Sequence, residues 1–297
     1  MRHWIEAARL RTLPLSISGI IIGTFLAADK GFVNLKITFL ALLTTIGFQV
    51  LSNFANDYGD GVKGTDNKDR IGPERTIQSG KITPKQMMKA MKLTGLITLI
   101  IAVLLIYLAF GYENFALSLT FFLLGIASIV AAIKYTVGSK AYGYIGLGDL
   151  FVLLFFGWLS VVGSYFLYTK ELDWSIFLPA TAVGFLSMGV LNLNNMRDFE
   201  SDKKSGKNTL IVKMGFKLGK IYHSVLLLSA IFLSLLYTFI YFNSAYQLLF
   251  LISLIPLGKH FIVVINNNNP KDLDGELKIL ALSTFLFTLL FGLGIIL

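Results

Sequence analysis

Long apolar runs constrain this chain more than any other feature of its sequence. A bilayer core about 30 Å thick is crossed by a helix of about 20 apolar residues. The composition is far more apolar than that of a soluble domain, with 55% hydrophobic and 14% charged residues. Nine transmembrane helices are predicted, at residues 13–29, 36–57, 91–111, 114–134, 146–168, 175–197, 218–242, 244–265 and 277–297. The predicted fold class is therefore an all-α polytopic membrane protein with a single domain over residues 1–297.

The start of the chain shares some features with a secretory signal. Arg2, Arg9 and Arg11 precede the first apolar run. That run is long for the apolar part of a signal peptide, however, and no convincing cleavage site follows it. We therefore expect it to be retained as a transmembrane helix. The chain has no cysteine, which excludes a disulfide framework, a thiolate nucleophile and a cysteine metal site.

The net charge of +9 would suit nucleic-acid binding, but its distribution indicates membrane topology instead. With nine spans, nearly all lysines and arginines fall on the same side as the N-terminus. Cytoplasmic loops of membrane proteins are enriched in these residues, which also attract anionic lipid headgroups. We expect a protein of the cytoplasmic (inner) membrane with its N-terminus in the cytoplasm, its C-terminus outside, lipid around it and no nucleic-acid partner.

Polar residues are concentrated in three long cytoplasmic connections, residues 58–90, 134–146 and 197–217, whereas the outer connections are short. A functional site is therefore expected to face the cytoplasm. Two of these connections begin alike, because LSNFANDYGD leaves the second span and LNLNNMRDFESD leaves the sixth. The similarity of these two segments, which lie four helices apart, suggests two similar four-helix halves followed by a ninth helix.

Two clusters of asparagine and aspartate lie at the ends of these spans. Residues three and four apart share a helix face, so one stripe is formed by Asn53, Asn56, Asp57 and Asp60 and the other by Asn194, Asp198 and Asp202. Carboxylates crowded near a bilayer repel one another and lose solvation, which requires a cation between them. That cation is either a lysine or arginine of the same loops or a divalent metal. The pairing of the two clusters favours a functional site over a solvated helix end.

The sequence offers hard oxygen ligands and no zinc pattern. His3, His223 and His260 are scattered along the chain, and none belongs to an HExxH motif. Carboxylates favour Mg²⁺, which is usually completed by water and substrate phosphate. Two facing stripes would then bind a diphosphate through bridging magnesium ions. Cations near enough in sequence to neutralise the remaining charge are Lys63, Arg70, Arg75, Arg197, Lys203 and Lys207.

At these residues the chain resembles the UbiA-type intramembrane prenyltransferase superfamily, whose members have nine helices and two aspartate-rich motifs. The matching segments are NDYGDGVKGTD at 56–66 and RDFESDKKSGKNTL at 197–210. The chain is most similar to the branch that prenylates 1,4-dihydroxy-2-naphthoate in menaquinone synthesis, on WIEAARLRTLPLSISG, YTVG at 135–138, YGYIGLGDL at 142–150 and FFGWLSVVGSYF at 155–166. Gly64 stands at the third acidic place of the first motif, so Asp57 and Asp60 are expected as ligands ahead of Asp66.

The resemblance implies a central cavity in which a polyprenyl group passes from polyprenyl diphosphate to 1,4-dihydroxy-2-naphthoate, with loss of CO₂ and diphosphate. It implies Mg²⁺ held by Asp57, Asp60, Asp198 and Asp202, with Lys63 as a further catalytic residue. The expected substrate-binding residues are Asn53, Asn56, Asn194, Arg70, Arg197, Lys207, Tyr135, Tyr142, Tyr144 and Asp149. The tyrosines and Asp149 belong to a glycine-rich loop for which two interpretations stay open: a lid that orients the acceptor, or, for the tyrosines, ordinary anchors at the membrane interface.

Two alternatives stay open. The same family fold is compatible with another acceptor, such as 4-hydroxybenzoate, haem or a glycerol lipid. A secondary transporter would also combine two related halves around a site in the membrane. It would place its acids deep within the spans, however, and here they cluster at one face. A magnesium-dependent aromatic prenyltransferase is therefore the favoured function.

Overall fold

The computed structural model describes residues 2–66 and 71–297, and every regular element within them is helical. The helices are α1 (Arg2–Ala8), α2 (Leu13–Asp29), α3 (Leu35–Lys63), α4 (Pro84–Phe110), α5 (Phe115–Lys134), α6 (Gly148–Val152), α7 (Ser160–Thr169), α8 (Phe177–Arg197), α9 (Phe199–Lys204), α10 (Leu210–Met214), α11 (Phe216–Ile240), α12 (Leu254–Asn266) and α13 (Asp274–Ile296). A π-helical stretch, Leu153–Leu159, joins α6 to α7. Short 3₁₀ segments precede α12 and α13, at Ala245–Ser253 and Pro270–Leu273.

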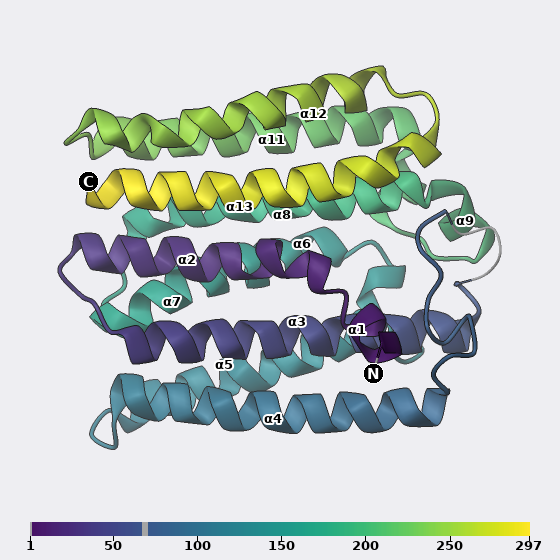
Figure 1. Ribbon diagram of the computed structural model, residues 1–297, viewed down its shortest axis with the longest axis horizontal. Coiled ribbons are helices and arrows are strands. Elements are labelled where there is room, and N and C mark those ends of the chain that lie inside the picture. Colours follow the sequence, from purple (N-terminus) through teal and green to yellow (C-terminus); the bar gives the residue numbers. More distant parts are fainter. Residues whose placement is uncertain (1, 67–70) are drawn as a thin grey trace.

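Nine helical segments of the described residues are long and apolar enough to cross a membrane. The predicted all-α architecture with nine spans is thereby confirmed, and the chain is an integral membrane protein. The long helices lie side by side with the long polar connections and the N-terminus at one end of the molecule and the C-terminus at the other (Figure 1). The grouping into two four-helix halves and the single-domain organisation stay predictions.

Two helix boundaries differ from the predicted ones in a way that shapes the site. Helix α3 continues to Lys63, six residues past its predicted end, and stops at Gly64, whose φ of 72° is easily adopted by glycine. Helix α4 already begins at Pro84, because Thr83 and Gln86 form a capping box there. The polar first motif is therefore mostly helical, and it extends the apolar span beyond the membrane edge.

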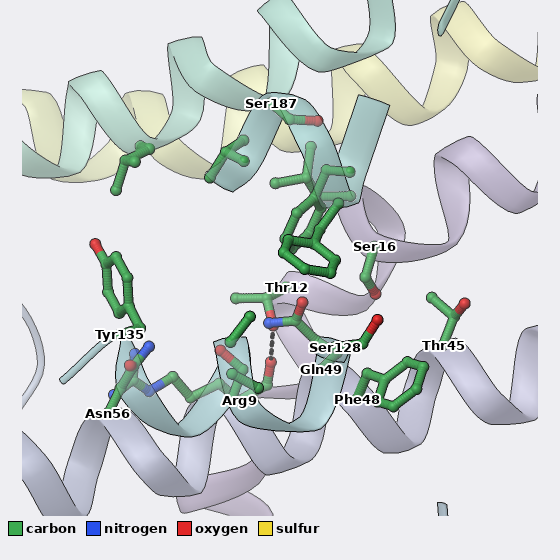
Figure 2. A pocket seen from close by; sticks show the side chains of 18 of the residues that line it. Arg9, Thr12, Ser16, Thr45, Phe48, Gln49, Asn56, Ser128, Tyr135 and Ser187 are labelled. Atoms are coloured by element: carbon green, nitrogen blue, oxygen red, sulfur yellow. Dashed lines mark hydrogen bonds between the residues drawn. The ribbon is translucent and has the colours of Figure 1, made fainter. Parts of the chain in front are cut away.

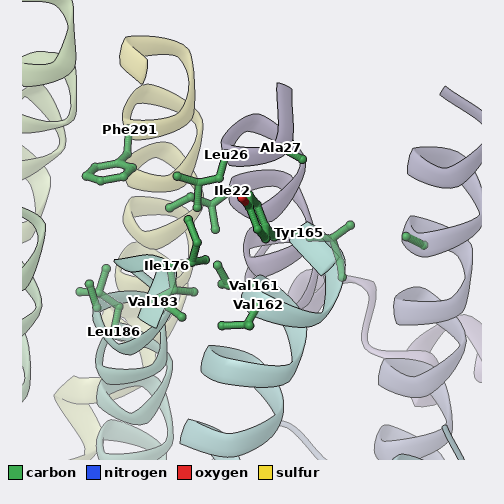
Figure 3. Packing of buried hydrophobic residues seen from close by; sticks show 14 of the residues in the cluster. Ile22, Leu26, Ala27, Val161, Val162, Tyr165, Ile176, Val183, Leu186 and Phe291 are labelled. Carbon is green, nitrogen blue, oxygen red and sulfur yellow. The ribbon is translucent and has the colours of Figure 1, made fainter. Parts of the chain in front are cut away.

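Helix α2 packs in the middle of the bundle against α7 and α13. Figure 3 shows Ile22 and Leu26 of α2 beside Val161 of α7 and Phe291 of α13, and all four side chains are almost completely buried. Small residues let these helices approach closely, as is usual in membranes. A Cβ atom on Gly23 of α2 would lie 2.5 Å from the carbonyl oxygen of Val161 in α7. The packing fixes the positions of α2, α7, α8 and α13, which all contribute to the cavity described next.

Candidate active site

A cavity of about 920 Å³ opens between the helices at the end that carries the polar loops. Its lining is charged near the loops, with Arg9, Asp57, Asp60 and Arg197 among the residues there, and apolar farther in. Figure 2 shows Thr45, Phe48 and Asn56 of α3 on one side of this space and Ser187 of α8 on the opposite side. The cavity suits a molecule with a charged head and a long apolar tail.

One wall of this cavity is formed by α6, the π-helical stretch and α7. The residues of this wall that face the cavity include Phe151, Val152, Phe155, Phe156, Leu159, Ser160, Gly163, Ser164 and Leu167. Along this wall, large aromatic and aliphatic side chains at 151–159 are therefore followed by small ones at 160–164. π-Helical insertions are rare and frequently occur at functional sites.

The two aspartate motifs meet at the polar end of the molecule. A small pocket of about 10 Å³, roughly the space of one water molecule, is lined by Asp60, Thr65, Asp66, Arg75, Asn194, Asp198, Ser201, Asp202 and Lys207. Asp60 and Asp202, which belong to different motifs, are 3% and 4% exposed. Residues separated by more than a hundred positions thus converge on one buried acidic site.

Lys207 connects the two motifs. Its Nζ atom lies 3.6 Å from Asp60 Oδ2 and 3.9 Å from Asp202 Oδ1. Gly206, with φ of 72°, turns the chain after α9, and the Lys207 amide donates to the Asp202 carbonyl oxygen. Burial by itself lowers the pKa of Lys207, but Asp60 and Asp202 outweigh it and raise the pKa above the ordinary value. The ammonium group is therefore charged and balances the crowded carboxylates.

The carboxylate of Asp57 accepts hydrogen bonds from the segment that follows α3. Its Oδ2 accepts from the Thr76 amide at 3.1 Å and the Thr76 hydroxyl at 2.6 Å, and its Oδ1 accepts from the Ile77 amide at 3.2 Å. This anchor holds Arg75 at the site, with its guanidinium 4.0 Å from Asp60 Oδ2 and 3.6 Å from Asp66 Oδ2. Asp57 still lines the large cavity, but in this structure it positions a loop as well.

Arg197 organises the second motif. It forms a two-bond fork with Asp198, with Nε to Oδ1 at 2.9 Å and Nη2 to Oδ2 at 2.6 Å, and it also donates to Asn194 Oδ1 at 2.9 Å. A further bond of 2.7 Å reaches Asp274 at the start of α13. Paired guanidinium and carboxylate groups of this kind are among the strongest polar contacts in proteins. The arginine that the sequence predicts as a phosphate contact therefore already directs four of its five N–H donors to carboxylate and amide oxygens.

The loop between α5 and α6 places three predicted tyrosines around the site. Tyr135 and Tyr142 line the large cavity, and the Tyr142 hydroxyl donates to the Ala131 carbonyl oxygen. The Tyr144 hydroxyl instead donates to Asp60 Oδ1 at 2.7 Å and lies 2.6 Å from the Thr65 hydroxyl. Burial raises the pKa of Tyr135 to about 12, and burial together with the charge of Asp60 raises the pKa of Tyr144. The phenols are therefore neutral hydrogen-bond donors at physiological pH.

Four of the predicted catalytic and substrate-binding residues that the structure describes line neither cavity: Asn53, Lys63, Tyr144 and Asp149. Asn53 donates to the Ala8 carbonyl oxygen at 2.8 Å, so it ties α3 to the N-terminal segment. Lys63 donates to the Thr136 carbonyl oxygen at 2.7 Å and lies 3.8 Å above the Tyr144 ring. Asp149 accepts from the Tyr222 hydroxyl at 3.1 Å and lines neither cavity. Arg70 lies outside the described residues.

Three features of the site have no counterpart in the sequence predictions. Asp274 lies in the loop before the ninth predicted span and gives no local signal of its contact with Arg197. Thr76 binds Asp57 from a loop whose fold cannot be read from composition. The histidines that are scattered in sequence are joined in space, with His223 Nε2 2.9 Å from His260 Nε2. The basic residues before the first span were a usable signal, since Arg9 and Arg11 line the large cavity.

The donor chemistry at the meeting point of the motifs fits magnesium. Within residues 2–66 and 71–297 no group of three or more acidic or histidine side chains is gathered closely enough to bind one metal ion. The small pocket nevertheless collects four carboxylates and the Asn194 amide from both motifs in a space of atomic size. Oxygen donors of this kind are those that Mg²⁺ prefers. Lys207 and Arg75 supply positive charge beside the same carboxylates.

Comparison with known proteins gives one consistent result. Residues 16–289 match the UbiA prenyltransferase family. The chain is 44% identical to the 1,4-dihydroxy-2-naphthoate octaprenyltransferase of Escherichia coli, over 99% of this chain and 95% of the relative, and 44% identical to that of Haemophilus influenzae, over 100% and 96%. A solved UbiA homologue from Archaeoglobus fulgidus bound to GPP and Mg²⁺ has the same fold, with a TM-score of 0.64, 16% identity and coverage of 97% of this chain and 99% of that one. The chain is therefore a prenyltransferase and belongs to the UbiA prenyltransferase family.

Proposed function

We propose that the protein transfers a polyprenyl group from polyprenyl diphosphate to 1,4-dihydroxy-2-naphthoate and so forms demethylmenaquinol, the reduced form of demethylmenaquinone. The observation that carries this proposal is the convergence of both aspartate motifs at the mouth of a cavity with a polar head and an apolar interior. The names of the Escherichia coli and Haemophilus influenzae relatives, which are similar over nearly their whole length, support the same acceptor.

The diphosphate would bind at the polar end, where four carboxylates lie together with the cationic side chains of Arg75 and Lys207. Mg²⁺ held by Asp60, Asp198 and Asp202, with Asp57 and Asp66 beside them, would neutralise charge that grows on the departing diphosphate. Lys207 and Arg75 add fixed positive charge beside the same carboxylates. The negative charge on the diphosphate grows as the carbon–oxygen bond breaks, so the positive charge of the site stabilises the transition state more than the ground state.

The polyprenyl chain would occupy the apolar interior of the cavity. Phe48, Phe151, Phe155 and Phe156 line this space, and their ring faces offer cation–π attraction to an allylic cation while they exclude water. The cavity lies between membrane-spanning helices, so the substrate tail stays in an apolar environment throughout.

The acceptor would lie between the tyrosines of the α5–α6 loop and the N-terminal segment. Arg9 and Arg11 line the cavity near Thr12 and Gln49 and would attract an acidic aromatic ring. Tyr135 and Tyr142 line the same cavity and present neutral aromatic surfaces. During transfer a carbon–carbon bond to the ring forms, the carbon–oxygen bond to diphosphate breaks, and the carboxylate leaves as CO₂.

We also infer that the protein resides in the cytoplasmic (inner) membrane with its site and N-terminus facing the cytoplasm. The lysines and arginines are concentrated in the connections at the end that carries the N-terminus (Figure 1), and positive loops are retained on the cytoplasmic side. A cysteine introduced at Lys140 would then react with an impermeant thiol reagent only when the cytoplasmic face is accessible. Reaction from the outer face would contradict this orientation.

An acceptor panel tests the proposed reaction. Purified protein in nanodiscs is incubated with octaprenyl diphosphate, Mg²⁺ and either 1,4-dihydroxy-2-naphthoate, 4-hydroxybenzoate or no acceptor. We expect a lipid-soluble naphthoquinol product and release of CO₂ with the first acceptor only, and no product when EDTA replaces Mg²⁺. Product with 4-hydroxybenzoate alone would reassign the acceptor, and full activity in EDTA would refute the role of the metal.

A further inference from the structure

Arg197 is 1% exposed and carries a single positive charge, yet it binds two carboxylates from distant parts of the chain. One belongs to Asp198 of the second motif, and the other to Asp274, the first residue of α13, whose Oδ1 atom is 2.7 Å from Arg197 Nη1. The side chain of Asp274 is 42% exposed, and both Arg197 and Asp274 line the large cavity. The last helix of the chain thus touches the second motif through one ion pair.

The first turn of α13 is held in place by buried contacts on its other side. Leu273 is completely buried with Leu193, Met196 and Val264. Glu276, 8% exposed, lies 2.6 Å from His260 Nδ1. His260 Nε2 lies 2.9 Å from His223 Nε2, and His223 Nδ1 lies 3.3 Å from Asn192 Nδ2. Four buried polar side chains therefore form a chain across α13, α12, α11 and α8.

The direction of these hydrogen bonds follows from the donors available. Asn192 Nδ2 also faces the Gly219 carbonyl oxygen at 3.1 Å, so this atom is the amide nitrogen and donates to His223 Nδ1. His223 must then carry its proton on Nε2 and donate to His260 Nε2. His260 in turn donates from Nδ1 to the Glu276 carboxylate. Each ring nitrogen has one role with both imidazoles neutral, and the chain fixes where α13 begins.

We propose that Asp274 is a positioning residue for the transfer reaction. It holds Arg197 so that the guanidinium keeps the Asp198 carboxylate aligned in the small pocket where the two motifs meet. The Glu276–His260–His223–Asn192 chain keeps Asp274 within reach of Arg197. This assignment rests on the proposed function for its kinetic readout. It adds α13, which carries neither aspartate motif, to the parts of the protein that determine turnover.

The physical reason is the geometry of Arg197. The guanidinium group has a fixed plane, so a bond on one edge limits how the opposite edge meets a carboxylate. Without the Asp274 carboxylate, the edge that faces α13 is released, and the fork to Asp198 loses its fixed orientation. Groups that orient a metal-binding or charge-stabilising carboxylate typically change affinity or activity by about 10-fold to 100-fold.

The experiment compares Asp274→Asn with Asp272→Asn, which removes the same charge two residues earlier on an exposed side chain. For Asp274→Asn we expect kcat to fall by about tenfold or more while KM for the naphthoate stays within about twofold. Asp274→Glu, which keeps the carboxylate on a partly exposed position, is expected to recover most of kcat. Asp272→Asn is expected to match the wild type in both constants.

A second readout does not depend on catalysis. The increase in Tm produced by inorganic pyrophosphate with Mg²⁺ is measured for each variant in detergent. We expect this increase to shrink for Asp274→Asn and to be unchanged for Asp272→Asn. If the wild type shows the Tm increase but no transfer, the proposed function fails, while a smaller Tm increase for Asp274→Asn still supports the positioning of Asp198 by Arg197 and Asp274. If Asp274→Asn keeps both the wild-type kcat and the wild-type Tm increase, the positioning role is overturned.

Glu276→Gln provides an independent variant, because it preserves side-chain shape while it removes the negative charge that accepts from His260. We expect kcat and the pyrophosphate-induced Tm increase to fall in the same direction as in Asp274→Asn, by a smaller factor. If Asp274→Asn fails to fold, the kcat and the pyrophosphate-induced Tm increase of Glu276→Gln test the proposal instead. Wild-type values for Glu276→Gln would then overturn the proposal.

Discussion

Asp57 in the first motif and Asp198 in the second each follow an asparagine by four residues, and each accepts hydrogen bonds at both carboxylate oxygens. Their partners differ in kind. Asp57 is held by two backbone amides and a hydroxyl, all of them neutral, whereas Asp198 is held by the charged fork of Arg197. The first motif therefore organises a loop, and the second organises the junction of α8 with α13.

The two kinds of hydrogen-bond donor respond differently when the aspartate that they bind is replaced. Neutral donors that lose an acceptor remain buried and unsatisfied, which costs stability directly. A buried arginine that loses one of two carboxylates still has the other, so the fold persists while the local orientation is lost. We therefore expect substitutions in the second motif to act mainly on turnover and substitutions at Asp57 to act on stability as well.

Asp198→Asn is expected to give the largest effect. It removes the charge paired with Arg197 and one oxygen ligand from the small pocket where the motifs meet, so the rate of prenyl transfer should fall by about 1,000-fold. The rate is measured with octaprenyl diphosphate and 1,4-dihydroxy-2-naphthoate at saturating Mg²⁺. Glu200→Gln, a neighbouring exposed acid, is the control and should stay near the wild-type rate. A near-normal rate for Asp198→Asn would remove the second motif from the catalytic account.

Lys207→Met tests the cation that joins the motifs. Without added metal, the loss of the ammonium between Asp60 and Asp202 should lower the free energy of unfolding by about 3 kcal/mol. The raised pKa of Lys207 means that its stabilising effect is fully present below the ordinary lysine pKa of 10.5 and is lost only as the pH rises beyond it. The Tm difference from the wild type should thus be constant from pH 7 to pH 9. A difference that vanished by pH 9 would contradict the raised pKa.

Asp57→Asn separates the two motifs most clearly. The asparagine would keep one oxygen acceptor and would turn its NH2 group toward the amide of either Thr76 or Ile77, so we expect a loss of about 1–3 kcal/mol in the free energy of unfolding together with lower turnover. Thr76→Val, which removes only the hydroxyl donor, should show a smaller loss. Equilibrium unfolding in detergent measures both. Equal stability of Asp57→Asn and Asp198→Asn would abolish the contrast between the motifs.

Tyr144→Phe should give the smallest effect. It removes the hydroxyl that donates to Asp60 and leaves the ring under Lys63 in place, so a change of about 1 kcal/mol, or about fivefold in rate, is expected. Tyr112→Phe, at a residue 81% exposed on the opposite side of the bundle, is the matched control. An effect larger than that of Asp57→Asn would mean that Tyr144 contacts the substrate.

Hydropathy was sufficient for the spans, because about 20 consecutive apolar residues have few alternatives to a transmembrane helix. It failed at the end of α3, where NDYGDGVK is too polar to be assigned to a span but remains helical until Gly64 allows the turn. The helical spacing of the two motifs was visible in the sequence. That they meet was an inference from electrostatics, and the structure places Asp60 and Asp202 on either side of Lys207.

Residue roles were harder to predict than the location of the site. Asn53 and Asp149 lie in the expected segments, yet one faces the N-terminal segment and the other faces Tyr222. A shift of one residue on a helix rotates a side chain by about 100°, so membership of a motif does not determine direction. Asp274 could not be found at all, because its partner lies 77 positions earlier and no local pattern marks the contact.

The π-helical stretch has a consequence for the shape of the cavity. Along its wall the lining residues recur in pairs every four positions, at 151 and 152, 155 and 156, 159 and 160, and 163 and 164. An ordinary α-helix has 3.6 residues per turn, so a four-residue recurrence would wind around it and leave the cavity. The wider winding of Leu153–Leu159 slows that rotation and keeps the pairs in register. This wall of the cavity therefore presents one continuous row of aromatic rings and small side chains to a flexible isoprenoid chain, from the headgroup inward.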